Sequence, residues 1–391
     1  MQNAAATTPT TEMQPRLARL APLLGEPLFD SILWGHEYDI AGVPETFHAW
    51  TSSGAVRRIV FYGMGCSSVV SDVMKGYIRS EGLPYAVDVV NDYESEWFID
   101  DSVLADPATL VVIVCYSGWS AEPCMFLERL AAKGVAARTL VLSGGGRIAA
   151  LCRESAVALV QYRLRHADRE YPLYHVQQFL AIFLDLFHRL GLAPSDGRAQ
   201  LEHAASWLRT AFTPALLAEC DRQAERLDGT AITFLSTARW NGTLLKQVTM
   251  FFNEIAMVPA HRHQLHEWSH TEVAAFSDPA RPLAIVVFTD PDDDGYTRRK
   301  VATMREVFDR AGVAANRNLR YEEIELAAPG FIAKYLYGSF VAMHVAFRLG
   351  LRANTAGRDL IATIAGNPWW SQAAIERHPS CVDIPSELRL S

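Results

Sequence analysis

The sequence lacks several features that mark whole classes of protein. It has no apolar run near the roughly 18 residues of a membrane span. Its start, MQNAAATTPTTEMQPRLARL, is small and polar, without the apolar core of a secretory signal peptide. The formal net charge is −8, so no basic excess indicates nucleic acid or an anionic membrane as partner. We therefore expect a soluble protein with neither partner.

Cysteine usage shows no disulfide framework. The six cysteines include no C-x-x-C pair and stand mostly in apolar surroundings. Cysteines of this kind are typically reduced and buried. We therefore expect a cytoplasmic protein.

The first half of the chain has the pattern of a parallel sheet. From Arg57 onward, apolar runs rich in Val and Ile alternate with helix-sized amphipathic stretches. The runs are RRIVFYG, YAVDVV, TLVVIVCYSG and RTLVLSGGG. Such runs predict buried parallel strands in a doubly wound sheet with helices on both faces.

The second half repeats this architecture after an APSDG linker. TAITFLST, PLAIVVFTD and LRYEEIEL predict strands, and NGTLLKQVTMFFNEIAMV and YTRRKVATMREVFDRAG predict helices. We expect an N-terminal extension over 1–45, domains over 46–192 and 193–353, and a C-terminal helix and tail over 354–391. Two such domains place clefts at the carboxyl ends of the strands and between the domains.

Two of the predicted strands end in turns rich in Gly and Ser. RRIVFYG is followed by MGCSS, and TLVVIVC is followed by YSGWSAE, with Ser117 and Ser120 in the turn. Such turns aim backbone N–H groups and a helix N-terminus at one point, which suits a phosphate. The alternative is that each serine only caps a helix. Ser68 stands where a dinucleotide fingerprint needs glycine, and no P-loop lysine follows.

The stretch HEWSH, His266 to His270, matches the H-E-x-x-H motif of zinc hydrolases. The longer form of that motif fails, because Val273 and Phe276 stand at its Gly and third His positions. Pro259 and the polar HRHQ precede the stretch, so a long amphipathic helix is not expected there. We predict no metal site, and we expect His261, His263 and His266 to lie in a solvated loop.

The turns resemble those of one known group. GMGCSS, CYSGWSAE and LSGGGRIAALCRE are similar to the turns of sugar isomerase (SIS) domains, and more narrowly to those of the bifunctional phosphoglucose/phosphomannose isomerase family. The resemblance covers roughly 57–351 and implies tandem SIS domains with a three-layer αβα architecture. It also implies that the first two turns hold the substrate phosphate through Gly65, Cys66, Ser67, Ser117 and Ser120.

The same resemblance explains HEWSH. NEIAMVPAHRHQLHEWSHTEV is similar to the family pattern N-E-N-A-K-x-P-A followed by P-E-L-N-H-N-E. It places Glu254 on the catalytic base, His270 on the histidine that opens the sugar ring, and Glu267 on a flanking acid that could contact substrate. Moving a proton between C1 and C2 through a cis-enediol needs one such carboxylate, and burial would raise its pKa toward a useful range.

Several positions depart from the family pattern. Leu173 replaces an active-site arginine, and Arg169, four residues earlier, is a candidate substitute. Gln247 stands at a second family arginine, with Lys246 beside it as a possible substrate contact. A missing guanidinium near an enediolate typically costs 10²–10³ in rate, so ordinary glucose 6-phosphate isomerisation is in doubt.

The main expectation is a metal-independent aldose–ketose isomerase of a sugar phosphate or related sugar, in carbohydrate metabolism, with no cofactor. One alternative is an amino-sugar phosphate deaminase or isomerase of the same fold. The other is a non-catalytic protein that binds sugar phosphate. The resemblance implies a homodimer, in which a second chain could supply a histidine.

Overall fold

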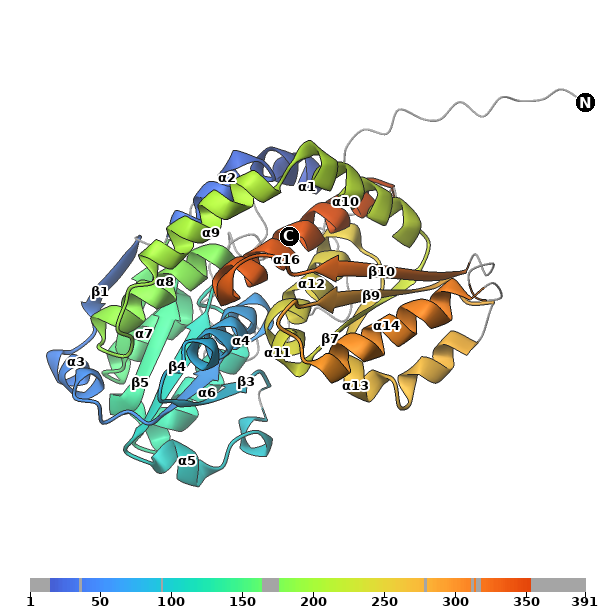
Figure 1. Ribbon diagram of the computed structural model, residues 1–391. Coiled ribbons are helices and arrows are strands. Elements are labelled where there is room, and N and C mark those ends of the chain that lie inside the picture. The colour runs from blue at the N-terminus through green and yellow to red at the C-terminus, as the bar shows by residue number, and fades with distance from the viewer. Residues whose placement is uncertain are drawn as a thin grey trace, which may run out of the picture.

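The described part of the chain contains two mainly parallel sheets, each covered by helices on both faces (Figure 1). The computed structural model describes residues 15–352 except 35–36, 93, 164–175, 278–279, 311–312 and 314–317. The predicted C-terminal helix and tail therefore lie outside the described residues, as do Arg169 and Leu173.

The first sheet has the strand order β1-β6-β5-β4-β2-β3. Its strands are β1 (Tyr38–Gly42), β2 (Arg58–Tyr62), β3 (Ala86–Val90), β4 (Thr109–Cys115), β5 (Thr139–Ser143) and β6 (Ala158–Tyr162). All neighbours are parallel except β1, which runs antiparallel to β6. The four predicted strands are confirmed as β2 to β5. The sequence did not predict β1 or β6, and β1 comes from the predicted N-terminal extension.

Two layers of helices enclose this sheet. The helices are α3 (Glu45–Ser52), α4 (Gly65–Ser80), α5 (Asp101–Ala105), α6 (Ala121–Ala132), α7 (Gly146–Glu154) and α8 (Val176–Arg189). Helices α4 and α8 pack on one face, and α5, α6 and α7 pack on the other. Every residue of β4 is buried, as expected for a central strand covered on both sides.

The second sheet has the order β10-β9-β7-β8, with all neighbours parallel. Its strands are β7 (Ala231–Ser236), β8 (Ala260–Gln264), β9 (Leu283–Thr289) and β10 (Leu319–Glu325). The solvated loop predicted for His261, His263 and His266 is wrong, because the first two lie on β8 and His266 lies in the short helix α13 (Leu265–Trp268). Strand β8 is at the sheet edge, where polar side chains can stay accessible while the backbone pairs with β7.

The helices of the second half include one long interrupted helix. It runs through α11 (Ala238–Trp240), the π-helical η6 (Asn241–Leu245), α12 (Lys246–Phe251) and the π-helical η7 (Phe252–Ala256). The others are α9 (Arg198–Ala211), α10 (Pro214–Leu227), α13 (Leu265–Trp268), α14 (Gly295–Asp309) and α16 (Gly330–Arg352). Short helices α1 (Pro15–Leu20) and α2 (Glu26–Asp30) pack near α16 and α9.

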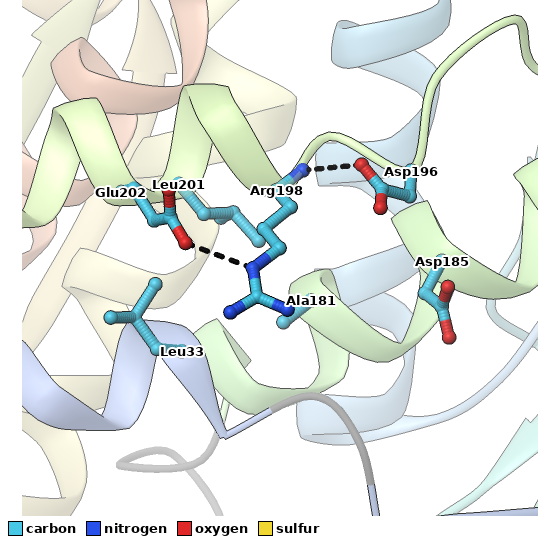
Figure 2. Close-up of a pocket in the computed structure, with 7 residues that line it drawn as sticks. All are labelled: Leu33, Ala181, Asp185, Asp196, Arg198, Leu201 and Glu202. Carbon is cyan, nitrogen blue, oxygen red and sulfur yellow. Dashed lines mark hydrogen bonds and ion pairs between the residues drawn. The ribbon is translucent and has the colours of Figure 1, made fainter.

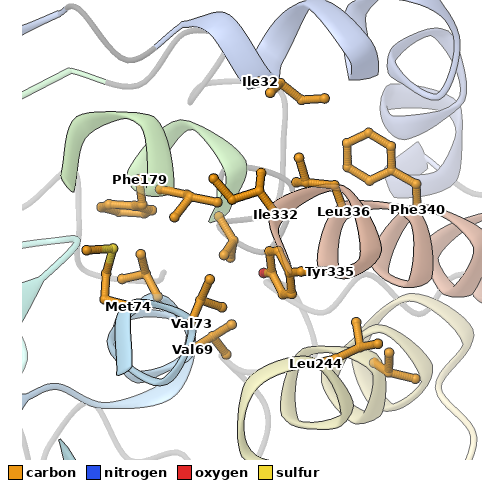
Figure 3. Packing of buried hydrophobic residues seen from close by; sticks show 14 of the residues in the cluster. Ile32, Val69, Val73, Met74, Phe179, Leu244, Ile332, Tyr335, Leu336 and Phe340 are labelled. Carbon is orange, nitrogen blue, oxygen red and sulfur yellow. The ribbon is translucent and has the colours of Figure 1, made fainter. Parts of the chain in front are cut away.

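One apolar core joins the two halves. Figure 3 shows Val69, Val73 and Met74 of α4 facing Phe179 of α8, the buried face of α16 and Leu244 of η6. Burial of this continuous core fixes α4 against the long interrupted helix, which positions the groups described next. No helix within the described part of the chain is long and apolar enough to cross a membrane.

Candidate functional site

The turns that follow β2, β4 and β5 form one hydrogen-bonded platform at the carboxyl edge of the first sheet. The Tyr116 amide donates to Ser67 Oγ at 3.1 Å, which links the first turn to the second. The Gly144 amide donates to the Tyr116 carbonyl at 3.3 Å, and the Ile148 amide donates to the Gly118 carbonyl at 3.0 Å. Three segments that are distant in the sequence are therefore held in one arrangement.

Glycine is required where the second and third turns meet. Gly118 has a φ of +76°, and a Cβ at this position would lie 2.0 Å from the Gly145 carbonyl oxygen. Gly146 faces Gly118 from the other side, with a Cβ position 2.6 Å from the Gly118 carbonyl. Only glycine allows backbones to approach this closely.

The platform presents helix N-termini together with serine hydroxyls. Helix α4 begins at Gly65 and α6 begins after Ser120, and the Ser120 side chain makes no capping hydrogen bond. Ser117 Oγ accepts from the Trp119 amide at 3.1 Å, so this hydroxyl keeps its own proton to donate. Helix N-termini with nearby hydroxyl donors are suited to bind a phosphate or another anion.

Glu254 comes from the second domain and lies close to the start of α4. A Cβ on Gly65 would be 3.9 Å from the Met250 methyl group, one turn before Glu254. Burial and, to a smaller extent, the nearby Glu254 carboxylate raise the pKa of the Cys66 thiol to about 12. Burial raises the pKa of Glu254 itself to about 7. The two domains therefore bring a carboxyl group that titrates near neutrality beside a potential anion site.

The turn after Glu254 is fixed by its neighbours. The π-helical segment η7 ends at Ala256, and the next residue, Met257, adopts the left-handed conformation with φ 54°. The Asn253 side chain makes two hydrogen bonds to the Ala260 backbone: it accepts from the amide at 3.0 Å and donates to the carbonyl at 3.2 Å. π-helical turns and left-handed non-glycine residues cluster at functional sites, which makes this segment a candidate.

HEWSH does not form the helix of a zinc hydrolase. Helix α13 ends at Trp268, so the two histidines do not lie one turn apart on a helix. His266 Nε2 lies 3.1 Å from Thr297 Oγ1, and its ring stacks on Tyr296 at 5.4 Å. Among the described residues, no group of three or more His, Cys, Asp or Glu side chains could hold a metal ion.

His270 and Glu267 are both exposed. The His270 amide donates to the Glu267 carbonyl at 2.9 Å, and the His270 side chain makes no hydrogen bond to the described residues. The structure therefore does not join His270 to Glu254 within one chain.

Lys246 and Gln247, where the resemblance places a second arginine, contact different neighbours. Lys246 Nζ lies 2.7 Å from Asp72 Oδ2 on α4, so the predicted substrate contact is already paired across the domains. Gln247 is fully buried and accepts hydrogen bonds from Tyr335 at 2.5 Å and Ser339 at 3.0 Å. The sequence analysis did not identify Arg262, which lies on β8 close to Lys246 and Asp72.

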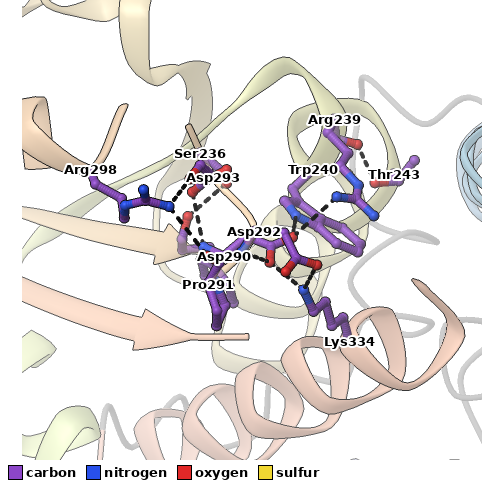
Figure 4. A network of polar contacts seen from close by, with 11 residues as sticks. Ser236, Arg239, Trp240, Thr243, Asp290, Pro291, Asp292, Asp293, Arg298 and Lys334 are labelled. Atoms are coloured by element: carbon purple, nitrogen blue, oxygen red, sulfur yellow. Dashed lines mark hydrogen bonds and ion pairs between the residues drawn. The ribbon is translucent and has the colours of Figure 1, made fainter. Parts of the chain in front are cut away.

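The corresponding edge of the second sheet is closed by charged groups. Figure 4 shows Asp290, at the end of β9, meeting Lys334, Trp240 and Arg239. Trp240 Nε1 donates to Asp290 at 2.8 Å, and Lys334 also pairs with Asp292 at 2.5 Å. These contacts occupy the carboxylate, so this edge presents no platform like that of the first domain.

A cleft elsewhere on the surface contains none of the predicted residues. It lies among α8, α9 and the turn before residue 35, and Figure 2 shows its lining of Leu33, Ala181, Asp185, Asp196, Arg198, Leu201 and Glu202. Arg198 pairs with Glu202 at 2.8 Å, and Asp185 pairs with Arg189 at 3.0 Å. These ion pairs satisfy charges within the cleft wall.

Comparison with known proteins identifies the fold. Residues 218–358, which include Glu254 and His270, match the bacterial phospho-glucose isomerase C-terminal SIS domain. The C-terminal domain of glucosamine-fructose-6-phosphate aminotransferase from Francisella tularensis superposes with a TM-score of 0.60 at 14% identity, covering 90% of this chain and 100% of that chain. Tagatose-6-phosphate ketose/aldose isomerase from Escherichia coli gives a TM-score of 0.54 at 15% identity, with 87% and 90% covered. No curated protein sequence matches the chain.

Proposed function

We propose that this chain, an SIS-domain protein that resembles the phosphoglucose isomerases, is a metal-independent aldose–ketose isomerase of a sugar phosphate. One observation carries the proposal: the Glu254 carboxyl group lies beside the start of α4, and burial raises its pKa to about 7. A general base works best when its pKa is near the operating pH, because it must both accept and return a proton.

The proposed reaction uses the platform for binding and Glu254 for chemistry. The sugar phosphate binds at the N-termini of α4 and α6, with Ser117 and Ser120 donating hydrogen bonds. The Glu254 carboxylate removes a proton from one of the two carbons C1 and C2 and returns it to the other through a cis-enediol. Cys66 is a neutral thiol near pH 7, because burial raises its pKa to about 12, so it adds no negative charge to the anion site.

His270 acts in the site of a second copy under this proposal. Its ring is exposed and makes no hydrogen bond to the described residues, so it is accessible to a partner chain. There it would transfer protons between the ring oxygen and the anomeric hydroxyl. A homodimer is therefore part of the proposal. Loss of the dimer would lower the turnover rate more than it lowers the affinity for phosphate.

Solvent proton exchange tests the proposed reaction. Proton NMR in D₂O with hexose, pentose and amino-sugar phosphates should show deuterium at C2 of the true substrate, with and without a chelator. Glu254→Gln should abolish the exchange without unfolding the protein, and Glu306→Gln, at an exposed glutamate on α14, should not change it. Exchange that persists in Glu254→Gln would exclude the proposed base.

A second candidate is a non-catalytic sugar-phosphate-binding protein. Gln247 favours it, because a buried amide bonded to Tyr335 and Ser339 supplies no positive charge to an enediolate. This candidate predicts that sugar phosphates raise the melting temperature without exchange or products. An amino-sugar phosphate enzyme of the same fold would instead release or move the amine, which the same NMR spectra would reveal.

A further inference from the structure

A second polar cluster lies where the two domains meet, further along α4 from the Glu254 site. Helix α4 contacts η6 and α12 of the long interrupted helix, which lies beside it in Figure 1. The cluster consists of Asp72 on α4, Asn241 on η6, Lys246 on α12 and Arg262 on β8, and we call it the Asp72 cluster. Lys246 and Asp72 are 2.7 Å apart, and their side chains are only 12% and 16% exposed.

Arg262 and Asn241 complete the cluster from the second domain. Arg262 Nη1 donates to the Asn241 carbonyl at 2.9 Å and to Asn241 Oδ1 at 2.6 Å. Asn241 is 8% exposed, and its Nδ2 is a buried donor with no hydrogen-bond partner among the described residues. Because Oδ1 of the same amide is held by Arg262, Nδ2 is also close to the arginine. A buried donor without a partner is unusual and indicates that an acceptor is absent.

The charges of the cluster do not balance. Lys246 and Arg262 contribute two positive charges, and Asp72 contributes one negative charge. Burial lowers the pKa of Lys246 and of Arg262, and the nearby Asp72 only partly opposes this. Buried charges in proteins are normally paired, because an uncompensated charge is costly to remove from water.

The cluster is separate from the proposed catalytic site. Asp72 lies six residues after Cys66 on α4, which is about 9 Å along a helix. Lys246 lies eight residues before Glu254, which is about 12 Å by the same measure. A ligand held at the start of α4 could therefore reach the cluster only with a second group about 10 Å away.

We propose that Lys246, Arg262 and Asn241 Nδ2 bind an oxyanion, either a carboxylate or a phosphate, while Asp72 orients the lysine. The bound anion neutralises the excess positive charge and accepts the free amide proton. The anion comes either from free phosphate or from a second acidic group on the sugar ligand. This site does not depend on Glu254 acting as a base.

Calorimetric titration with inorganic phosphate at constant ionic strength tests the site. We expect Arg262→Gln to weaken one class of phosphate sites about tenfold or more, as is typical when a charge-assisted hydrogen bond is lost. Arg305→Gln removes an exposed arginine that pairs with Glu323 and should leave the titration unchanged. Ser120→Ala should weaken only phosphate that is bound at the platform. The two kinds of phosphate site are therefore distinguished, and the absence of binding at the platform is detected independently of the Asp72 cluster.

Asp72→Asn gives a prediction of opposite sign. It leaves two cations without their carboxylate, so phosphate should bind more tightly, whereas a purely structural ion pair predicts no gain. A hexose 6-phosphate and the corresponding aldonic acid 6-phosphate then separate the two sources of the anion. Selective loss of the acid ligand in Arg262→Gln assigns the subsite to the substrate, and equal behaviour of both ligands assigns it to free phosphate. Identical phosphate binding by the wild type, Arg262→Gln and Asp72→Asn would overturn the proposal.

Discussion

Replacement of Glu254 by glutamine should change the pH dependence of stability in a predictable direction. Burial raises the pKa of Glu254 from an ordinary 4.5 to about 7 in the folded protein. Below pH 4.5 the group is protonated in both the folded and unfolded states, so it contributes no difference. Between pH 4.5 and 7 the unfolded state ionises first, and the folded state loses relative stability. Above pH 7 this loss is complete.

The size of the effect follows from the same two values. Each tenfold change in proton affinity is worth 1.36 kcal/mol, so ionised Glu254 destabilises the folded protein by at most about 3 kcal/mol. Glutamine has nearly the same shape and no charge. Glu254→Gln should therefore match the wild type near pH 4.5 and exceed its unfolding free energy by up to about 3 kcal/mol at pH 8.

Urea unfolding at pH 4.5 and pH 8 measures this difference directly. For each protein, the unfolding free energy at pH 4.5 is subtracted from the value at pH 8. The difference for the wild type is then subtracted from the difference for the variant, so the contributions of other titrating groups cancel. Glu306→Gln changes an exposed carboxylate on α14. Its unfolding free energy relative to the wild type should be nearly the same at the two pH values. If the advantage of Glu254→Gln is the same at both pH values, burial does not raise the pKa of Glu254, and the main support for a neutral-pH base is lost.

Three further predictions concern the platform, the buried ion pair and acid stability. Gly118→Ala should destabilise the protein by more than 2 kcal/mol as a rough estimate and abolish phosphate binding, because its Cβ would lie 2.0 Å from a backbone oxygen. Gly134→Ala, also at positive φ but with open space around it, should cost only about 1 kcal/mol, and equal costs in urea unfolding would contradict the steric argument. Lys334→Met should cost about 3–5 kcal/mol by leaving the buried Asp290 carboxylate without its ammonium partner, and a cost below 1 kcal/mol would show that the pair is dispensable. His344→Leu should reduce the loss of stability between pH 6.5 and 4, because burial lowers the pKa of this histidine to about 4 and only the unfolded state gains the proton in that range; an unchanged acid profile would contradict this.

The architecture was largely predictable because its central strands are buried on both faces. Continuous apolar runs identify β2, β4, β5, β7 and β9, since such strands have little polar side to mask the pattern. The edge strands β3 and β10 were also predicted, although β10 is largely polar and only Ile324 in it is buried. The edge strands β1 and β8 and the short β6 were not predicted. The residues Ala260–Gln264 are mostly polar and form a strand only because the edge of β7 is available for pairing.

The candidate site was predictable in its parts but not in its assembly. Strand ends followed by Gly and Ser indicate anion-binding turns, because the local backbone geometry alone creates the donors. The approach of Glu254 to Cys66 depends on packing between domains, which no local pattern encodes. For the same reason Arg262 was missed, since its position relative to Asp72 and Asn241 follows from the pairing of β8 with β7.

The central claim is that Glu254 transfers a proton between two carbons of a bound sugar phosphate. The most direct test is deuterium incorporation at C2, followed by proton NMR in D₂O for the wild type and Glu254→Gln with the same substrate. We predict exchange by the wild type, unchanged by a chelator, and none by the variant while its phosphate affinity is retained. Equal exchange by both proteins, or binding without exchange by the wild type, would contradict the proposed reaction.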